Sequence, residues 1–318
     1  MMMDQRRPDG SLRHLITLEG IRRDEIEALL ERSAYFARAI GERPPRDATL
    51  QGITIANLFT EPSTRTRVSF ELAGRRLGAD VINLEVQLSS RVKGETMLDT
   101  IFTLQALHFD VFVIRDAQPG VLALVAANVA PGVCVLSAGE AHLSHPTQGL
   151  LDALTIRQRK GRLEPLKICI VGDIRHSRVA RSAYQIFRTL EAREIRLVAP
   201  AALMPEANEF AGCTRYHSLE EGLAGVDVVM MLRIQKERIA QTDIPDGEEY
   251  FARYGLTPQR LARAAPDAIV MHPQPMNRGI EIASEVADGP QSVIRDQVSN
   301  GVAVRMAVLE RVAGNLTA

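Results

Sequence analysis

Apolar runs of four to seven residues alternate with helical stretches along almost the whole chain. Runs rich in β-branched and apolar residues favour strands, and apolar residues at every third or fourth position favour helices. Strands and helices in alternation are typical of parallel sheets with helices on both faces. The expected strands are 53–59, 81–84, 110–115, 133–139, 167–173, 195–199, 226–232 and 267–271. We therefore predict an α/β protein with doubly wound parallel sheets flanked by helices.

The chain length of 318 residues predicts two such domains, since single cores stop growing near this size. A long helix expected from about 149 to 160 is placed to bridge the domains, and an amphipathic stretch over 300–316 is expected to return to the first. We predict a first domain at residues 1–145 plus a C-terminal helix at 297–318. The second domain is predicted at 146–296, with the active site in the cleft between the two.

The charge balance excludes several classes of partner. Lysine and arginine total 38 against 39 aspartate and glutamate, so there is no bulk positive field for nucleic acid. No apolar run is long enough for a membrane span of about 18 residues. Residues 1–10 have basic residues but no apolar stretch behind them, which predicts a frayed tail and no secretory signal. We expect a cytoplasmic protein with no nucleic-acid or membrane partner.

Motifs for metals, disulfides and dinucleotides are missing from the sequence. Cys134, Cys169 and Cys213 are odd in number and widely spaced, which predicts reduced thiols. His142 and His145 lie three residues apart but have no third ligand nearby. The turn after the run 167–173 has one glycine and therefore lacks the dinucleotide fingerprint. We expect neither a cofactor nor a metal.

The segment FTEPSTRTR at residues 59–67 joins a predicted strand to a predicted helix. Ser63 is the expected N-cap, and the amides of the first helical turn carry partial positive charge that attracts anions. Arg65 and Arg67 are unfavourable at this end of a helix unless an anionic ligand compensates them. The segment predicts an anion cradle; an N-capped surface helix with solvated arginines is the alternative.

Further polar residues follow the carboxyl ends of other predicted strands, where ligands bind in parallel sheets. Arg115 and the segment 145–148 lie at such ends in the first half, and Arg178, Arg233 and Gln235 in the second. An arginine fork matches a carboxylate, so two arginines suit a dicarboxylic substrate. Singly, Arg178 or Arg233 is better explained as a surface or structural ion pair; together, with an anion cradle in the other half, they indicate a dicarboxylate.

Several of these motifs together resemble the carbamoyltransferase family. The segments 63–67 (STRTR) and 145–148 (HPTQ) are similar to the two motifs with which the family binds carbamoyl phosphate. The segments 171–173 (VGD), 233–238 (RIQKER) and 272–275 (HPQP) resemble the members that use aspartate. The His-Cys-Leu-Pro and Ser-Met-Gly segments typical of the ornithine members are not present. The resemblance runs in order and spacing from about Phe59 to Arg305.

The resemblance implies roles for particular residues, and it implies that no cofactor or metal is needed. The residues implied to hold carbamoyl phosphate are Ser63, Thr64, Arg65, Thr66, Ser89, Lys93, Arg115, His145, Gln148, Gln274 and Pro275. The residues implied in catalysis are Arg65, Thr66, Lys93, Arg115 and His145. The residues implied to bind aspartate are Lys93, Arg178, Arg233 and Gln235. For His145, a structural histidine that caps its own loop is the alternative.

The resemblance also implies an assembly and a reaction. Lys93 is expected to reach the active site of a neighbouring subunit in a homotrimer, with Ser89 or Ser90 beside it at the phosphate. One departure from the family is Val92, where some members have a second basic residue. Another is Gln274, at a position where relatives vary; the contact expected there runs largely through the backbone. The implied reaction carbamoylates L-aspartate on the way to pyrimidines. The alternatives are another acceptor such as ornithine, and a silent scaffold paralogue; regulatory chains or a dihydroorotase are left open.

Overall fold

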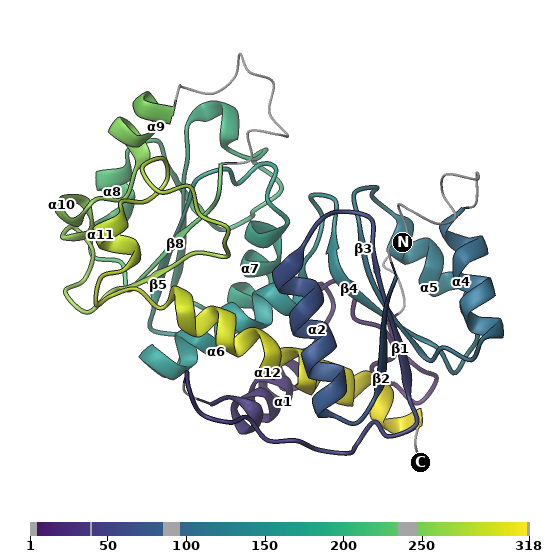
Figure 1. Cartoon of the computed structure of the whole chain (residues 1–318). Helices are drawn as coiled ribbons and strands as arrows, with labels where there is room; N and C mark the ends of the chain where they lie inside the picture. Colours follow the sequence, from purple (N-terminus) through teal and green to yellow (C-terminus); the bar gives the residue numbers. More distant parts are fainter. Residues whose placement is uncertain (1–4, 39, 85–95, 235–246, 317–318) are drawn as a thin grey trace. The chain divides into compact units, whose positions relative to one another are not determined.

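The computed structural model describes residues 5–38, 40–84, 96–234 and 247–316 of the chain. It divides into two compact units (Figure 1). The first unit comprises Met1–Leu151 with Ser299–Ala318, and the second comprises Asp152–Val298. The unit boundaries fall inside two helices, α6 (Pro146–Lys160) and α12 (Ile294–Ala313). The helix α12 begins six residues before the 300–316 stretch that the sequence predicted.

The first unit contains a four-stranded parallel sheet in the order β2-β1-β3-β4. Its strands are β1 (Thr54–Phe59), β2 (Asp80–Leu84), β3 (Val111–Asp116) and β4 (Cys134–Glu140). Its helices are α1 (Arg23–Phe36), α2 (Thr64–Arg76), α4 (Met97–Ala106) and α5 (Val121–Asn128), with a short 3₁₀ turn η4 (Gly314–Leu316). The expected alternation of strand and helix is confirmed here.

Helices cover both faces of this sheet, with α2 on one face and α4 and α5 on the other (Figure 1). Along β1 the side chains alternate between the faces, as in any strand. Ala56 and Leu58 lie in the core cluster with α4 and α5. Ile55 faces α2, which approaches closely at Gly74. A Cβ added to Gly74 would lie 3.0 Å from Cδ1 of Ile55. Because both faces are buried, the strand is apolar along most of its length.

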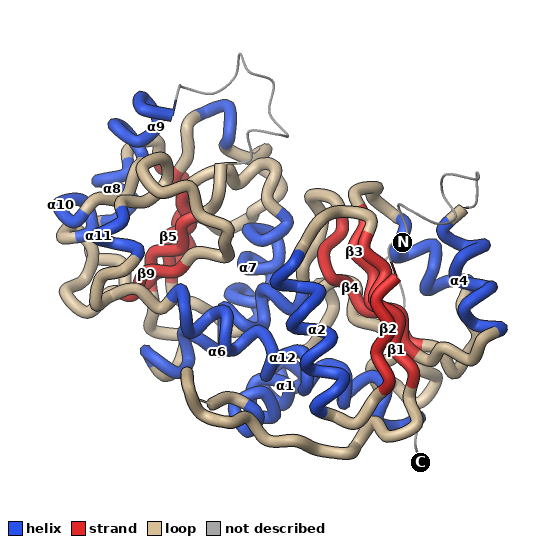
Figure 2. Tube along the Cα trace, viewed as in Figure 1, coloured by secondary structure: helices blue, strands red, loops and turns tan. Residues whose placement is uncertain are grey.

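The second unit contains a five-stranded parallel sheet in the order β7-β6-β5-β8-β9. Its strands are β5 (Lys167–Val171), β6 (Glu194–Val198), β7 (Thr214–Tyr216), β8 (Val228–Met231) and β9 (Ile269–Met271). Its helical segments are α7 (Arg178–Thr189), η2 (Ala201–Leu203), α8 (Leu219–Leu223), α9 (Gly247–Tyr254), α10 (Pro258–Leu261) and α11 (Ser284–Ala287). Figure 2 shows its strands among these helices. The sequence did not predict β7, which has three residues, one exposed and two partly buried.

Gly172, directly after β5, is expected to tolerate no side chain. Its φ is +126°, and an added Cβ would lie 2.8 Å from the carbonyl oxygen of Leu232. That backbone is fixed because the Leu232 amide donates to the Val171 carbonyl at 2.8 Å. We expect Gly172→Ala to lower the free energy of unfolding by about 2–5 kcal/mol, from backbone strain plus overpacking. The measurement is the loss of thermal or urea stability.

Gly225→Ala is the matched control for Gly172→Ala. Its φ is +64°, but no described heavy atom lies within 4 Å of an added Cβ. It therefore carries backbone strain alone, and we expect a loss of about 1 kcal/mol. Equal losses in the two variants would show that the approach of Leu232 is not what requires the glycine.

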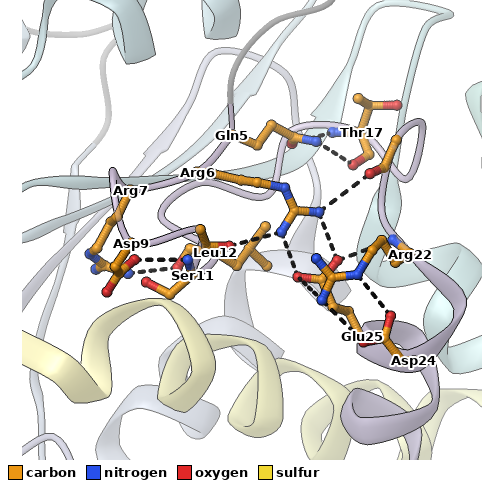
Figure 3. A network of polar contacts seen from close by, with 12 residues as sticks. Gln5, Arg6, Arg7, Asp9, Ser11, Leu12, Thr17, Arg22, Asp24 and Glu25 are labelled. Carbon is orange, nitrogen blue, oxygen red and sulfur yellow. Dashed lines mark hydrogen bonds and ion pairs between the residues drawn. The ribbon is translucent and has the colours of Figure 1, made fainter.

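The segment before α1 is ordered from Gln5 onward and is not the frayed tail that the sequence predicted. Leu15 pairs with Leu136 of β4, which extends the sheet edge by one bridge. Arg7 donates to the Val312 carbonyl of α12 at 2.6 Å. Arg6, also in this segment, contacts Glu25 of α1 (Figure 3). Its two terminal nitrogens donate to the two Glu25 carboxylate oxygens at 2.6 and 2.7 Å.

Arg6→Gln is expected to destabilise the first unit at neutral pH and much less in acid. Arg6 is the main cause that lowers the pKa of the buried Glu25 carboxyl. A lowered folded pKa adds stability above the unfolded pKa, and this stability is lost as pH falls through the folded value. The variant should therefore lose about 1.5–3 kcal/mol near neutral pH, and less in acid. Urea unfolding at both pH values measures this.

Arg23→Gln serves as the control for Arg6→Gln. Arg23 lies 3.9 Å from Glu27 on α1, and both side chains are about one-third exposed at 37% and 32%. Such a surface pair contributes less than about 1 kcal/mol, and salt screens it. A loss in Arg6→Gln that stayed constant from neutral to acid pH would contradict the role of the Glu25 charge.

Candidate active site

The carboxyl ends of β1, β3 and β4 are neighbours in the first unit, because these strands are parallel and adjacent. Past the end of β1, the Thr60 amide donates to the Arg115 carbonyl at 3.0 Å. Past the end of β4, the Ala141 amide donates to the Asp116 carbonyl at 2.8 Å. Ala141 has a φ of +42°, which turns the chain sharply away from the strand. The described segments of this half that carry predicted residues therefore meet at one sheet edge.

The helix α2 presents its first turn at this edge, with no acidic residue in it. Ser63 occupies the N-cap position, as predicted, but its side chain makes no capping hydrogen bond to a described residue. The first amides of any helix lack partners within the helix, so they remain available to an anion. Thr64 and Arg65 are exposed, whereas Thr66 is buried. Farther along α2, Phe70 packs under the buried guanidinium of Arg305, 5.0 Å from its ring centre.

Arg115 lies in β3 with its guanidinium at the same edge. Its Nη1 donates to the Ala138 carbonyl at 3.2 Å, and its Nε lies 3.3 Å from Oε2 of Glu61. Glu61 belongs to the motif that joins β1 to α2, but sequence reasoning gave it no role. The ion pair is largely buried, with 14% and 18% of the two side chains exposed. Glu61 therefore holds the Arg115 cation at the sheet edge.

His145 and Gln148 lie at the start of α6, which begins three residues before the expected position near Gly149. Pro146 is its first residue, where the fixed φ of proline suits a helix and its missing N–H is not needed. The His145 carbonyl accepts from the Gln148 amide at 2.9 Å and from the Gly149 amide at 3.3 Å. Both side chains are buried. The predicted loop is thus a helical turn with His145 just before it.

Glu140, the last residue of β4, is a buried carboxylate that sequence reasoning missed. It accepts from the Leu122 amide at 3.1 Å, at the N-terminal end of α5. Burial is the main cause that raises its pKa, and Asp116 on the neighbouring strand adds to the increase. It anchors α5 to the end of the sheet. No sequence pattern predicted this contact, because Glu140 and Leu122 are 18 residues apart in the chain and belong to different elements.

The second unit presents its own polar residues at the ends of the adjacent strands β5, β8 and β9. After β5, the Ser177 hydroxyl accepts from the Ala180 amide at 3.1 Å and caps the first turn of α7. Arg178, the first residue of α7, is buried, and Arg233 after β8 is partly buried. Asp173 is fully buried and accepts from the His176 ring at 2.9 Å. Both predicted arginines therefore lie at this edge.

The remaining predicted residues fall into two groups. Gln274 and Pro275 follow β9, at the same edge as the two arginines. Ser89, Lys93 and Gln235 lie outside the described residues. The structure therefore places those predicted residues that it describes in two sets, one at each sheet edge.

Burial raises the pKa of the Cys134 and Cys213 thiols to about 11 and that of Cys169 to about 12, which keeps them protonated at neutral pH. Among the described residues, no group of three or more potential ligands is placed to hold a metal ion. None of the helices in that part of the chain has the length and apolar character to cross a bilayer.

Comparison with family models decides the relationship. Residues 13–158 match the model "Aspartate/ornithine carbamoyltransferase, carbamoyl-P binding domain". Residues 164–312 match the model "Aspartate/ornithine carbamoyltransferase, Asp/Orn binding domain". The chain belongs to the aspartate/ornithine carbamoyltransferase family. The resemblance that the sequence motifs indicated is thereby confirmed.

Solved structures of the family share this fold. Aspartate transcarbamoylase from Trypanosoma cruzi, in complex with carbamoyl aspartate and phosphate, is 32% identical, with a TM-score of 0.84 over 98% of this chain and 99% of that one. The same enzyme with N-(phosphonacetyl)-L-aspartic acid is 32% identical, with a TM-score of 0.82 over 94% and 95%. Ornithine carbamoyltransferase from Thermus thermophilus is 23% identical and has a TM-score of 0.83 over 95% and 99%, which shows the shared fold.

Proposed function

We propose that this chain is an aspartate carbamoyltransferase, which converts carbamoyl phosphate and L-aspartate to N-carbamoyl-L-aspartate and phosphate. One observation supports the proposal: the first turn of α2 lies at the carboxyl-end edge of the first sheet, and Arg178 and Arg233 lie at the carboxyl-end edge of the second. The 32% identity to the Trypanosoma cruzi aspartate enzyme over nearly the whole chain supports the same acceptor. The first unit binds carbamoyl phosphate and the second binds aspartate.

In the proposed reaction the α-amino nitrogen of aspartate attacks the carbamoyl carbon, and the bond from that carbon to the phosphate oxygen breaks. Residues 63–66 hold the phosphate, and Thr66, Arg115, His145 and Gln148 face the carbamoyl group. Negative charge develops first on the carbonyl oxygen and then on the leaving phosphate. Donors fixed at those two places lower the barrier because they need no reorganisation. The departing phosphate takes the proton that the amino group loses.

The acceptor follows from charge. Each arginine can hold one carboxylate of aspartate through a two-point contact. Ornithine has only one carboxylate, so one of the two arginines would have no anionic partner and would face the cationic part of the molecule. A silent scaffold paralogue would have lost the catalytic donors, and here the cradle residues, Arg115, His145 and Gln148 are all present.

The proposal includes an assembly and a setting. Lys93 and Ser89, which lie outside the described residues, complete the site of a neighbouring subunit in a homotrimer. The enzyme acts in the cytoplasm, at the step that commits aspartate to pyrimidines. Carbamoyl phosphate arrives activated, so no metal or cofactor takes part.

The test is an assay of the purified protein with carbamoyl phosphate and either aspartate or ornithine. We expect phosphate release and carbamoyl aspartate with the first acceptor, and no turnover with the second. Turnover with ornithine and none with aspartate would refute the acceptor assignment. No turnover with either, by a folded protein that still binds carbamoyl phosphate, would favour the silent paralogue.

A further inference from the structure

The segment after β9 holds its backbone in an uncommon conformation. Gln274 has a φ of +56°, in the left-handed region that residues other than glycine rarely adopt. Such a conformation is unfavourable for a residue other than glycine and persists only where surrounding contacts hold it. The Gln274 amide donates to Nδ1 of His272 at 2.9 Å. The ring of His272 therefore fixes the least favourable part of the segment.

His272 is itself held by a buried polar network. Its backbone amide donates to Oε1 of Gln297 at 2.9 Å, and Nε2 of Gln297 donates to Oδ1 of Asp152 at 2.8 Å. All three residues are buried, with His272 only 1% exposed. Because Nδ1 accepts a hydrogen bond, the neutral ring carries its proton on Nε2. This tautomer is the one that the Gln274 amide requires.

Glu281 contacts both ends of the segment. Its Oε1 lies 3.3 Å from Nε2 of His272, close enough for a charge contact but outside hydrogen-bond geometry. The same oxygen accepts from the Asn277 amide. Glu281 is fully buried, and its Oε2 has no hydrogen-bond partner within the described chain. A carboxylate buried in this way is costly. Such a local conflict is expected where function requires it.

We infer that His272 and Glu281 are positioning residues for the backbone of Gln274 and Pro275. The inference rests on the proposed function and on the resemblance, which implies that Gln274 and Pro275 hold carbamoyl phosphate and that the contact of Gln274 runs through its backbone. Glu281 orients the ring of His272 and the Asn277 amide, and the ring holds Gln274 at positive φ. A carbonyl oxygen held in this way can accept from the carbamoyl NH₂. Misplacement by about 1 Å can cost on the order of a hundredfold in rate.

The test compares His272→Leu, His272→Asn and Glu281→Gln with wild type. His272→Leu should lower kcat/KM for carbamoyl phosphate about 10- to 100-fold. His272→Asn should recover most of that loss, because the asparagine oxygen can accept from the Gln274 amide. Glu281→Gln should lower kcat/KM about tenfold, and its thermal stability should stay equal or rise because a neutral amide is less costly to bury.

Inorganic phosphate separates positioning from general damage. Its donors are assigned to the first unit, so its inhibition constant should be unchanged in all three variants. Asp288→Asn, which removes the exposed partner of Arg278 in the same unit, is the control and should behave as wild type. Equal losses in His272→Leu and His272→Asn, a parallel loss of phosphate affinity, or unchanged kinetics in Glu281→Gln would overturn the inference. Should His272→Leu not fold, Glu281→Gln decides alone.

The wild-type assay separates the two proposals. Absence of turnover with aspartate counts against the proposed function. Normal wild-type turnover combined with unchanged kinetics in Glu281→Gln counts against the positioning role alone.

Discussion

Arg65→Ala is expected to lower kcat/KM about 100- to 1000-fold, the usual effect of removing one donor that stabilises developing negative charge. Arg65 is exposed in the first turn of α2, where the helix already carries partial positive charge. A cation there opposes the helix dipole by about 0.3–1 kcal/mol. Removal of Arg65 should therefore leave the free energy of unfolding unchanged or slightly higher. Steady-state kinetics and urea unfolding of the same preparation measure both effects.

Arg75→Ala is the matched control on the same helix. Arg75 lies in the last turn, is 61% exposed, and pairs with Glu71 at 3.1 Å. A cation is favourable at that end, so its loss should lower stability by a few tenths of a kcal/mol. Activity should not change. The two variants therefore have opposite expected signs for stability and very different expected effects on rate. If Arg65→Ala were so destabilised that unfolding explained its lost activity, the role of Arg65 in binding the anion would be contradicted.

The parts of this fold that the sequence predicted are those set by local patterns. Buried parallel strands are apolar along their length, so β1 and β5 were found to within two residues at their ends. The cap at Ser177 follows from one hydroxyl before a helical stretch. The short strand β7 was not predicted because three residues, none of them buried, are too few to show a hydrophobic period. The start of α6 was misplaced by three residues, because the helix was expected to begin near Gly149 and it begins at Pro146.

The parts of the site that the sequence did not predict depend on contacts between distant residues. Glu61 faces Arg115 only because β1 and β3 are neighbours in the sheet. Glu281 meets His272 only because the chain turns back after residue 277. Charged residues in such segments look like ordinary surface residues in the sequence. The family motifs name the residues that face the substrates, whereas the buried partners that orient them require the structure.

Arg233→Gln is expected to raise the KM for aspartate about 10- to 100-fold, since a hydrogen bond to a charged group contributes about 1.5–3 kcal/mol. Arg233 follows β8, beside the end of β5 that leads to Arg178. In the proposed function its guanidinium binds one carboxylate of aspartate. Carbamoyl phosphate should bind as in wild type, because its donors are assigned to the first unit. Arg233→Lys keeps the charge but loses the two-point contact, so its KM for aspartate should lie between the values of wild type and Arg233→Gln.

Succinate makes the assignment of Arg233 sharper, because it has the two carboxylates of aspartate but no amino group and cannot react. Its inhibition constant should rise in Arg233→Gln by the same factor as the KM for aspartate. Arg253→Gln is the control in the same unit, since Arg253 is 59% exposed and lies 3.9 Å from Glu249. It should leave both constants unchanged. A KM for aspartate that rose while the succinate constant stayed fixed would place Arg233 at the amino group or the carbamoyl carbon. The carboxylate role, and with it the charge argument against ornithine, would then fail.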